Sequence, residues 1–158
     1  MTKTNAMRIL DALKISYATK QYDVDPEDLS GVHAAELMGL DPNGVFKTLV
    51  SRSDKGEIVV LCIPVHMELD LKKCAVAAGA KRLELTAVKE LLSLTGYIRG
   101  GCSPIGMKKK YRTFIDESAL TKEQILVSAG QRGVQICIKP NDLISAVSAV
   151  TADLCRSS

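Results

Sequence analysis

The sequence predicts an α+β domain in which strand hairpins alternate with short helices around a mixed or largely antiparallel sheet. Two patterns indicate this class: apolar residues recur at helical spacing in some segments and alternate with polar residues in others. A third is that glycine, proline and aspartate punctuate the boundaries between these segments. The chain has 158 residues, of which 46% are hydrophobic and 25% charged, as in globular proteins. We expect one domain over residues 1–158, because no repeat or linker is visible.

Each element follows from a local signal. Helices are expected where Thr4, Ser30 and Asp70 can act as N-caps, and from about Thr86 to Leu94. The turn at residues 53–56 predicts a β-hairpin, and further strands alternate on either side of the turn at 130–133. The expected helices span 4–15, 30–39, 71–78, 86–94 and 141–154, and the expected strands span 17–24, 45–52, 57–63, 111–115, 124–128 and 134–138.

Composition argues against several classes of protein. The longest apolar stretch, residues 58–65, contains Pro64 and is far shorter than the roughly 20 residues that cross a bilayer. Residues 1–15 carry charges among their apolar residues and do not resemble a secretory signal, so we expect a cytoplasmic protein without a membrane partner. Five cysteines and two histidines, without metal-ligand spacing, predict neither disulfides nor a metal site. Nucleotide-binding motifs are absent as well, and we expect no cofactor.

The formal charge of +3 is modest, but its distribution is uneven. One segment without an acidic residue carries five basic residues: Arg99, Lys108, Lys109, Lys110 and Arg112. Such a segment either forms a solvated loop or contacts phosphates. Aromatic residues are too scarce for a platform that stacks several bases, so any nucleic acid would be held by its backbone or by one end.

Lys47 and a glycine-rich segment are the candidate functional features. Strand alternation puts Lys47 on the face of Val45 and Leu49, where its ammonium either lines a cavity or extends to water. The segment at residues 100–106 can aim backbone N–H groups at a carbonyl or phosphate, or it forms a tight structural turn. Cys102 and Ser103 have no histidine nearby in the sequence, which disfavours a protein nucleophile.

An ordered set of motifs resembles the YbaK family, free-standing relatives of the editing domain inserted in bacterial prolyl-tRNA synthetase. The motifs are VFKTL at 45–49, LDLKK at 69–73, TGY at 95–97, GGCSPIG at 100–106 and VSAGQRG at 127–133. The resemblance extends from about Met7 to Leu154. It implies a curved, barrel-like mixed sheet with surrounding helices, and deacylation of mischarged tRNA, in the closest members Cys-tRNA(Pro). Mischarged tRNA is thus the expected partner, with prolyl-tRNA synthetase as a second candidate.

The resemblance also implies roles for individual residues. Lys47 matches the family's functional lysine, which we expect to be catalytic. Further matches are expected to bind substrate: Tyr22, Thr48, Gly100, Gly101, Ser103, Pro104, Ser128 and Gly130. Lys108, Lys109, Lys110 and Arg112 are expected to bind tRNA. Two positions depart from the pattern: Gln135 replaces the Asp common in Cys-specific members, and Leu29 lies where an aromatic residue is expected.

The family's mechanism needs no protein nucleophile. The thiol of the substrate attacks its own ester, Lys47 holds the 3′-terminal adenosine or its phosphate, and backbone N–H groups at residues 101–103 face the carbonyl. Water-mediated hydrolysis, and deacylation of another tRNA such as Ala-tRNA(Pro), are the nearest alternatives. A non-catalytic tRNA-binding module and a small-molecule esterase are alternatives from other classes.

Overall fold

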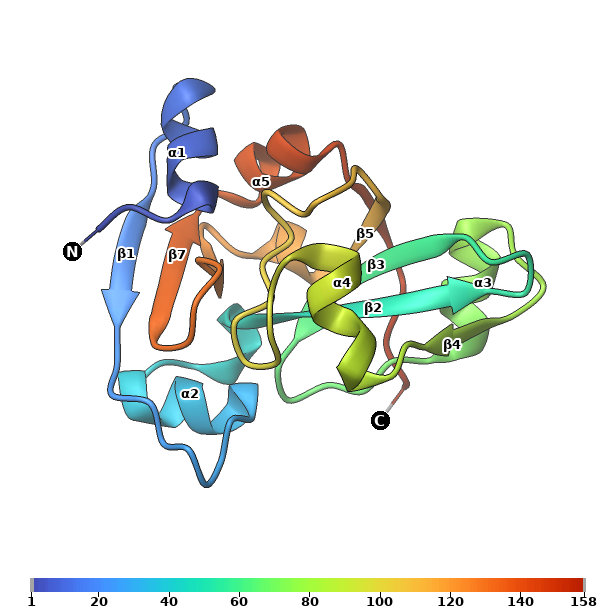
Figure 1. Ribbon diagram of the computed structural model, residues 1–158, viewed down its shortest axis with the longest axis horizontal. Coiled ribbons are helices and arrows are strands. Elements are labelled where there is room, and N and C mark those ends of the chain that lie inside the picture. The colour runs from blue at the N-terminus through green and yellow to red at the C-terminus, as the bar shows by residue number, and fades with distance from the viewer. Residues whose placement is uncertain (1, 158) are drawn as a thin grey trace.

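The computed structural model describes residues 2–157, and within them the strands form two sheets. The three-stranded sheet has the order β1-β7-β6 and the five-stranded sheet the order β4-β2-β3-β5-β8. Figure 1 shows β1 and β7 on one side of the molecule and the long β2–β3 hairpin on the other. The strands are β1 (Ala18–Gln21), β2 (Phe46–Ser53), β3 (Ile58–Pro64), β4 (Leu83–Leu85), β5 (Arg112–Asp116), β6 (Ile125–Ser128), β7 (Val134–Ile138) and β8 (Val150–Ala152).

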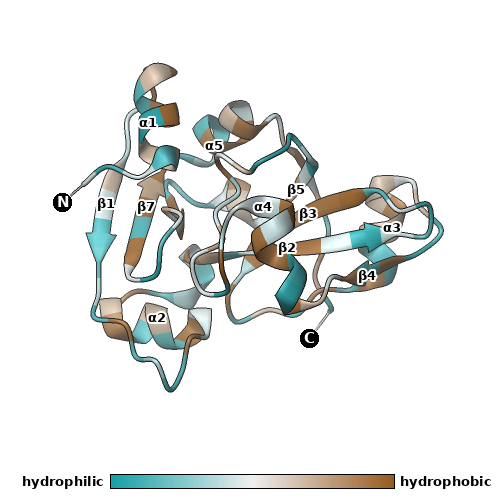
Figure 2. Ribbon diagram, viewed as in Figure 1, coloured by the Kyte–Doolittle hydropathy of each residue, from teal (hydrophilic) through white to brown (hydrophobic). Residues whose placement is uncertain are grey.

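The five-stranded sheet is mixed, as expected, and is built on the predicted hairpin. β2 and β3 pair antiparallel from Phe46↔Pro64 to Arg52↔Ile58, whereas β3–β5 and β5–β8 are parallel. The hairpin turn closes because Gly56 adopts a positive φ of 86° and Ser53 Oγ accepts hydrogen bonds from two turn amides. β3 is buried on both faces, and Figure 2 shows its hydrophobic character.

The two sheets meet at one parallel bridge, Val45↔Leu126, and do not close into a barrel. The α+β class with a mixed sheet is confirmed, but the single barrel-like sheet is replaced by this seam between two sheets. Beyond the bridge, the outer edge of β2 pairs with β4 only from Ser51 to Ser53. Residues 46–50 therefore form a stretch of that edge, hereafter the open edge, with no strand partner among the described residues.

Five α-helices surround the sheets in the described chain: α1 (Asn5–Ala12), α2 (Gly31–Met38), α3 (Leu71–Ala78), α4 (Leu91–Thr95) and α5 (Pro140–Val147). Three short 3-10 helices are also present in the described chain: η1 (Pro42–Gly44), η2 (Val88–Glu90) and η3 (Glu117–Thr121). Side chains of Thr4, Ser30 and Asp70 accept hydrogen bonds from first-turn amides, so the predicted N-caps are confirmed. None of the helices in residues 2–157 has the length and apolar character needed to span a membrane.

Two parts of the predicted secondary structure are wrong. The closing helix was expected to continue to Leu154, but α5 ends at Val147 because Ser148 adopts a left-handed φ of 53°, and β8 follows. β4 was not predicted, since three residues are too few for an alternation signal. Both short strands form at the edges of the five-stranded sheet, where pairing with a long strand stabilises them.

The core has three parts, of which the smallest positions the site. One cluster fills the space between the sheets, and a second packs α3 and the C-terminal segment against the other face of the larger sheet. The third cluster consists of Ala35, Val45, Val65 and Leu126. It packs α2 over the bridge between the sheets, which fixes α2 beside the open edge.

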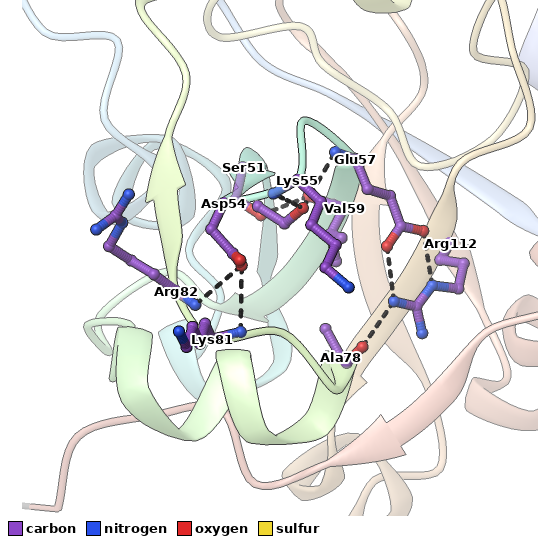
Figure 3. Close-up of polar contacts among 10 residues, drawn as sticks. Ser51, Asp54, Lys55, Glu57, Val59, Ala78, Lys81, Arg82 and Arg112 are labelled. Carbon is purple, nitrogen blue, oxygen red and sulfur yellow. Dashed lines mark hydrogen bonds and ion pairs between the residues drawn. The ribbon is translucent and has the colours of Figure 1, made fainter.

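Polar contacts tie the far end of the hairpin to α3 and β4. Arg112 donates two hydrogen bonds of 2.8 Å to Glu57 and one of 2.7 Å to the carbonyl of Ala78, while Asp54 accepts from the amides of Lys81 and Arg82 (Figure 3). Glu57 in turn raises the pKa of Arg112. These contacts place the Arg112 guanidinium in a structural network.

Candidate functional site

A cavity of about 370 Å³ lies along the open edge of β2. Its volume falls within the range typical of small-ligand sites. The open edge forms one wall, and the start of α2, the segment around η2, residues 99–102 and the ends of β6 and β7 form the others. The cavity thus occupies the split between the two sheets.

Hydrogen-bond alternation turns the backbone of Thr48 toward this cavity. The carbonyl of Val45 accepts from Val65, which follows β3, whereas that of Val50 accepts from Thr86 on the opposite side of β2. Successive residues of an antiparallel strand direct their backbone groups to alternate sides. Thr48, two residues before Val50, therefore presents its N–H and C=O to the open edge, while its side chain contacts Cys62.

Lys47 lines the cavity and has no partner within it. Its ammonium makes no hydrogen bond or ion pair with any residue in 2–157. Burial lowers the pKa of Lys47, and the Glu68 carboxylate offsets this shift only in part. Glu68 itself pairs with Arg156 at 3.1 Å. The cavity-lining interpretation of Lys47 therefore fits the geometry better than a solvated lysine.

Three polar side chains share one face at the seam. Lys47 and Ser128 each lie two residues beyond the Val45↔Leu126 bridge and both line the cavity, and Ser128 pairs with Gln135 across β6 and β7. Because side chains alternate along a strand, these three point to the same side as the Val45 cluster. They point away from the main core, which is the cluster between the two sheets. The cavity therefore combines their polar groups with an apolar wall.

The charge of the lining is positive. Lys47 and Arg99 are its charged residues, and none of the described lining residues is acidic. The remaining walls include Val65, Leu85, Val88 and Leu91, so the cavity suits a ligand with an anionic or polar end and a small organic part.

Cys102 lines the cavity but is not an activated nucleophile. Burial raises the pKa of its thiol to about 11, so it is protonated at neutral pH. Neither histidine lines the cavity: His33 contacts Asp25 at 3.0 Å and Glu36 at 3.3 Å, and His66 is exposed. The described residues thus offer no Cys–His pair in the cavity.

The two glycine-containing motifs pack directly against each other behind the cavity. The position of a Cβ on Gly101 lies 3.1 Å from backbone atoms of Gln131 and Arg132, and Arg132 Nε donates to the Arg99 carbonyl at 2.8 Å. The Gly130 backbone, at φ 101°, lies against the Tyr97 ring. These glycines are needed because the two loops approach each other closely.

The predicted catalytic residue, Lys47, and the predicted substrate-binding residues divide into two groups. Tyr22, Lys47, Thr48, Gly100 and Ser128 line the cavity, whereas Gly101, Ser103, Pro104 and Gly130 do not.

The second group supports the cavity from behind. The Gly101 amide donates to the Ile98 carbonyl, and buried Ser103 accepts from the Ile105 amide. The Gly101 N–H is therefore not available to a substrate carbonyl. No local sequence pattern assigns Leu85, Val88 and Leu91 to the site, because their place in it depends on the fold.

The basic segment also divides in the structure. Lys108, Lys109 and Lys110 are exposed after α4 and form no ion pair with described residues, so their charges are available to phosphates. Arg112, expected to act with them, is instead bound to Glu57 and Ala78. We retain the three lysines as the candidate tRNA contacts.

Residues 27–146 match the family described as "Aminoacyl-tRNA editing domain". The chain is 43% identical over 152 residues to the Enterococcus faecalis protein named "Putative Cys-tRNA(Pro)/Cys-tRNA(Cys) deacylase EbsC", covering 96% of this chain and 93% of that protein. It is 26% identical to the proline–tRNA ligase of Brachyspira hyodysenteriae over 77% of this chain and 21% of that enzyme.

A solved structure shares the fold. The crystal structure described as "a putative trans-editing enzyme for prolyl tRNA synthetase" aligns with a TM-score of 0.82 at 22% identity, over 99% of this chain and 100% of that one. The chain therefore belongs to the aminoacyl-tRNA editing domain family. This confirms the family resemblance carried by the sequence motifs.

The contact between the two glycine loops makes a prediction about stability. Gly101→Ala should lower the free energy of unfolding by about 1–3 kcal/mol, because its new methyl group would meet backbone that cannot rotate away. Gly44→Ala is the matched control, since nothing lies within 4 Å of its Cβ position and its φ is not positive. Urea denaturation of both variants measures the difference. Equal stabilities would show that the loops tolerate separation.

Proposed function

We propose that this chain removes Cys from mischarged Cys-tRNA(Pro) in trans. The observation that carries the proposal is the unpaired, half-buried Lys47 ammonium in a cavity suited to an aminoacyl group. Membership of the editing family and the name of the E. faecalis relative support the substrate class. We place the activity in the cytoplasm, with prolyl-tRNA synthetase as a further candidate partner.

The chemistry follows from the lack of an activated nucleophile in the cavity. The cysteine sulfur of the substrate attacks its own ester carbonyl, so a C–S bond forms and the bond from the carbonyl carbon to the ribose oxygen breaks. The thiol proton ends on the ribose hydroxyl. The products are tRNA and a four-membered cyclic thioester, without oxidation or reduction.

The protein's contribution is orientation and electrostatic stabilisation. Lys47 holds the ribose or phosphate of the 3′-terminal adenosine, with Arg99 adding positive charge at the cavity. The Thr48 N–H, directed to the open edge, is our candidate donor to the developing oxyanion. It replaces the Gly101 N–H, which is bonded to Ile98.

Two alternatives use the same cavity. A water nucleophile would allow clearance of an amino acid without a thiol, as in Ala-tRNA(Pro), and loss of catalysis would leave a tRNA-binding module. Incubating the protein with Cys-tRNA(Pro) and Ala-tRNA(Pro) separates them. Cleavage of the Cys ester supports the proposal, whereas cleavage of only the Ala ester, or of neither, contradicts it.

Removing the Lys47 charge should abolish deacylation. Lys47→Met keeps most of the stem and should lower kcat/KM at least about 100-fold, equivalent to about 2.7 kcal/mol of transition-state stabilisation. Lys47→Arg should restore only part of the rate, because a planar guanidinium replaces the compact ammonium. The control is Lys122→Met, a partly exposed lysine outside the cavity lining, which should retain the wild-type rate. A Lys47→Met rate within about threefold of wild type would remove this lysine from the mechanism.

Cys102→Ala should retain most of the activity, because a thiol of pKa about 11 supplies almost no thiolate at neutral pH. Single-turnover deacylation of Cys-tRNA(Pro) measures the rate, and circular dichroism checks that the variant is folded. A folded variant with a loss of more than about 100-fold would mean that the protein, not the substrate, supplies the nucleophile.

The three lysines after α4 should set the salt dependence of tRNA binding. Replacing Lys108 and Lys109 with Ala should flatten the plot of log K against log salt by about one unit per lost phosphate contact. Arg112→Ala should leave the slope unchanged and lower stability instead, because its guanidinium bridges Glu57 and Ala78. An unchanged slope in the Lys108/Lys109 variant would identify the segment as a solvated loop.

A further inference from the structure

The Gln135 carboxamide is an unpaired polar group in the cavity wall. Gln135 is 7% exposed, and its Oε1 has no hydrogen-bond partner among residues 2–157. Among the described residues, the other buried side-chain polar atom without a hydrogen-bond partner is Ser118 Oγ, which lies on η3 and outside the cavity lining. Buried polar groups are nearly always paired, so an unpaired group in a ligand cavity indicates that the ligand supplies its partner.

The position of Gln135 on β7 aims its side chain at the seam. Its strand neighbours Val134 and Ile136 point into the main core, so Gln135 points to the opposite face, as does its cross-strand partner Ser128. Ser128 Oγ accepts from the Gly130 amide and makes no hydrogen bond to Gln135 Oε1. A half-turn about the terminal side-chain bond lets the carboxamide present either oxygen or nitrogen to the cavity.

The rest of the lining explains which ligand group this oxygen can serve. The described lining contains two cations and no carboxylate, so an N–H donor on the ligand finds no acidic partner. Its serine and threonine hydroxyls keep acceptor capacity but already make other bonds, as Ser30 does with the His33 amide and Thr86 with the Val50 carbonyl, whereas Gln135 Oε1 makes none. The positive lining also disfavours an ammonium and favours a neutral amine.

We propose that Gln135 is a specificity-determining residue whose Oε1 accepts a hydrogen bond from the α-amino group of the aminoacyl ester. This inference rests on the proposed function, because it requires an aminoacyl group in the cavity. A neutral carboxamide holds the amine without fixing it as an ammonium beside Lys47. Gln135 thereby binds the α-amino group, which every amino-acid ester carries and the ester of a simple mercapto acid lacks.

The test compares two stable analogues of the aminoacyl end. One is 3′-amino-3′-deoxyadenosine carrying Cys through an amide, and the other carries 3-mercaptopropionate, which keeps the thiol and lacks the α-amine. Gln135→Met should weaken binding of the first about tenfold, or about 1.4 kcal/mol, and of the second by less than about twofold. Cys137→Ser, on the same face of β7 but outside the cavity lining, is the control and should change neither affinity.

A second measurement excludes a purely structural role. Gln135→Met should keep or raise the thermal unfolding midpoint, because it removes an unpaired buried polar group at similar volume. The proposal would be overturned if Gln135→Met weakened binding of both analogues equally, left binding unchanged, or lowered the unfolding midpoint. It would also be overturned if the wild-type protein bound the two analogues with equal affinity. Deacylation of Cys-tRNA(Pro) by the wild type is assayed separately, so selectivity for the amine without deacylation would contradict the proposed function alone.

Discussion

The open edge of β2 is the constraint on which the rest of the site depends. A strand edge inside a protein normally pairs along its length, because buried backbone groups need partners. Here the outer edge is bridged to β6 only at Val45, just before β2, and pairs with β4 only from Ser51, so the two neighbouring strands diverge between these points. The divergence creates a cavity whose wall is main chain rather than side chain. It also explains why the sheets do not close into a barrel, since closure would pair the residues that the cavity leaves open.

The same divergence brings distant segments together around Lys47. α2 is held by the cluster around Val45, and residues 99–102 are held by the close approach of the two glycine loops. Because these supports lie behind the lining, Gly101 and Ser103 act on the site through packing rather than through contact with a ligand. Motif residues therefore divide into those that line the cavity and those that hold it, and the sequence motif alone does not separate them.

Local signals in the sequence were sufficient for the features that depend on neighbouring residues. The hairpin turn at Gly56 and the cap at Asp70 depend on residues a few positions away, and both form as predicted. β4 and β8 depend instead on long strands distant in sequence, so three-residue segments gave no usable pattern. The partner of Arg112 was likewise hidden, because Glu57 lies 55 residues away along the chain. For the site, alternation placed Lys47 on the face of Val45, but only the meeting of the two sheets decides that this face borders a cavity.

The electrostatics of the cavity depend on two polar groups in its lining that have no partner among the described residues, the Lys47 ammonium and the Gln135 carboxamide oxygen. Two charged residues outside the cavity lining have protein partners: Arg112 pairs with Glu57, and Glu68 pairs with Arg156. Lys47 is within the influence of Glu68, yet that carboxylate is bound to Arg156 and only partly offsets the lowering of the lysine's pKa by burial. An unpaired ammonium and an unpaired carboxamide in one cavity both cost stability in the empty protein. That cost is recovered when a ligand supplies an anionic or hydroxyl group to Lys47 and an N–H to Gln135, and an aminoacylated ribose carries both at its ester end. On the proposed function, these two unpaired groups are thus the physical basis of selectivity for an aminoacyl ester.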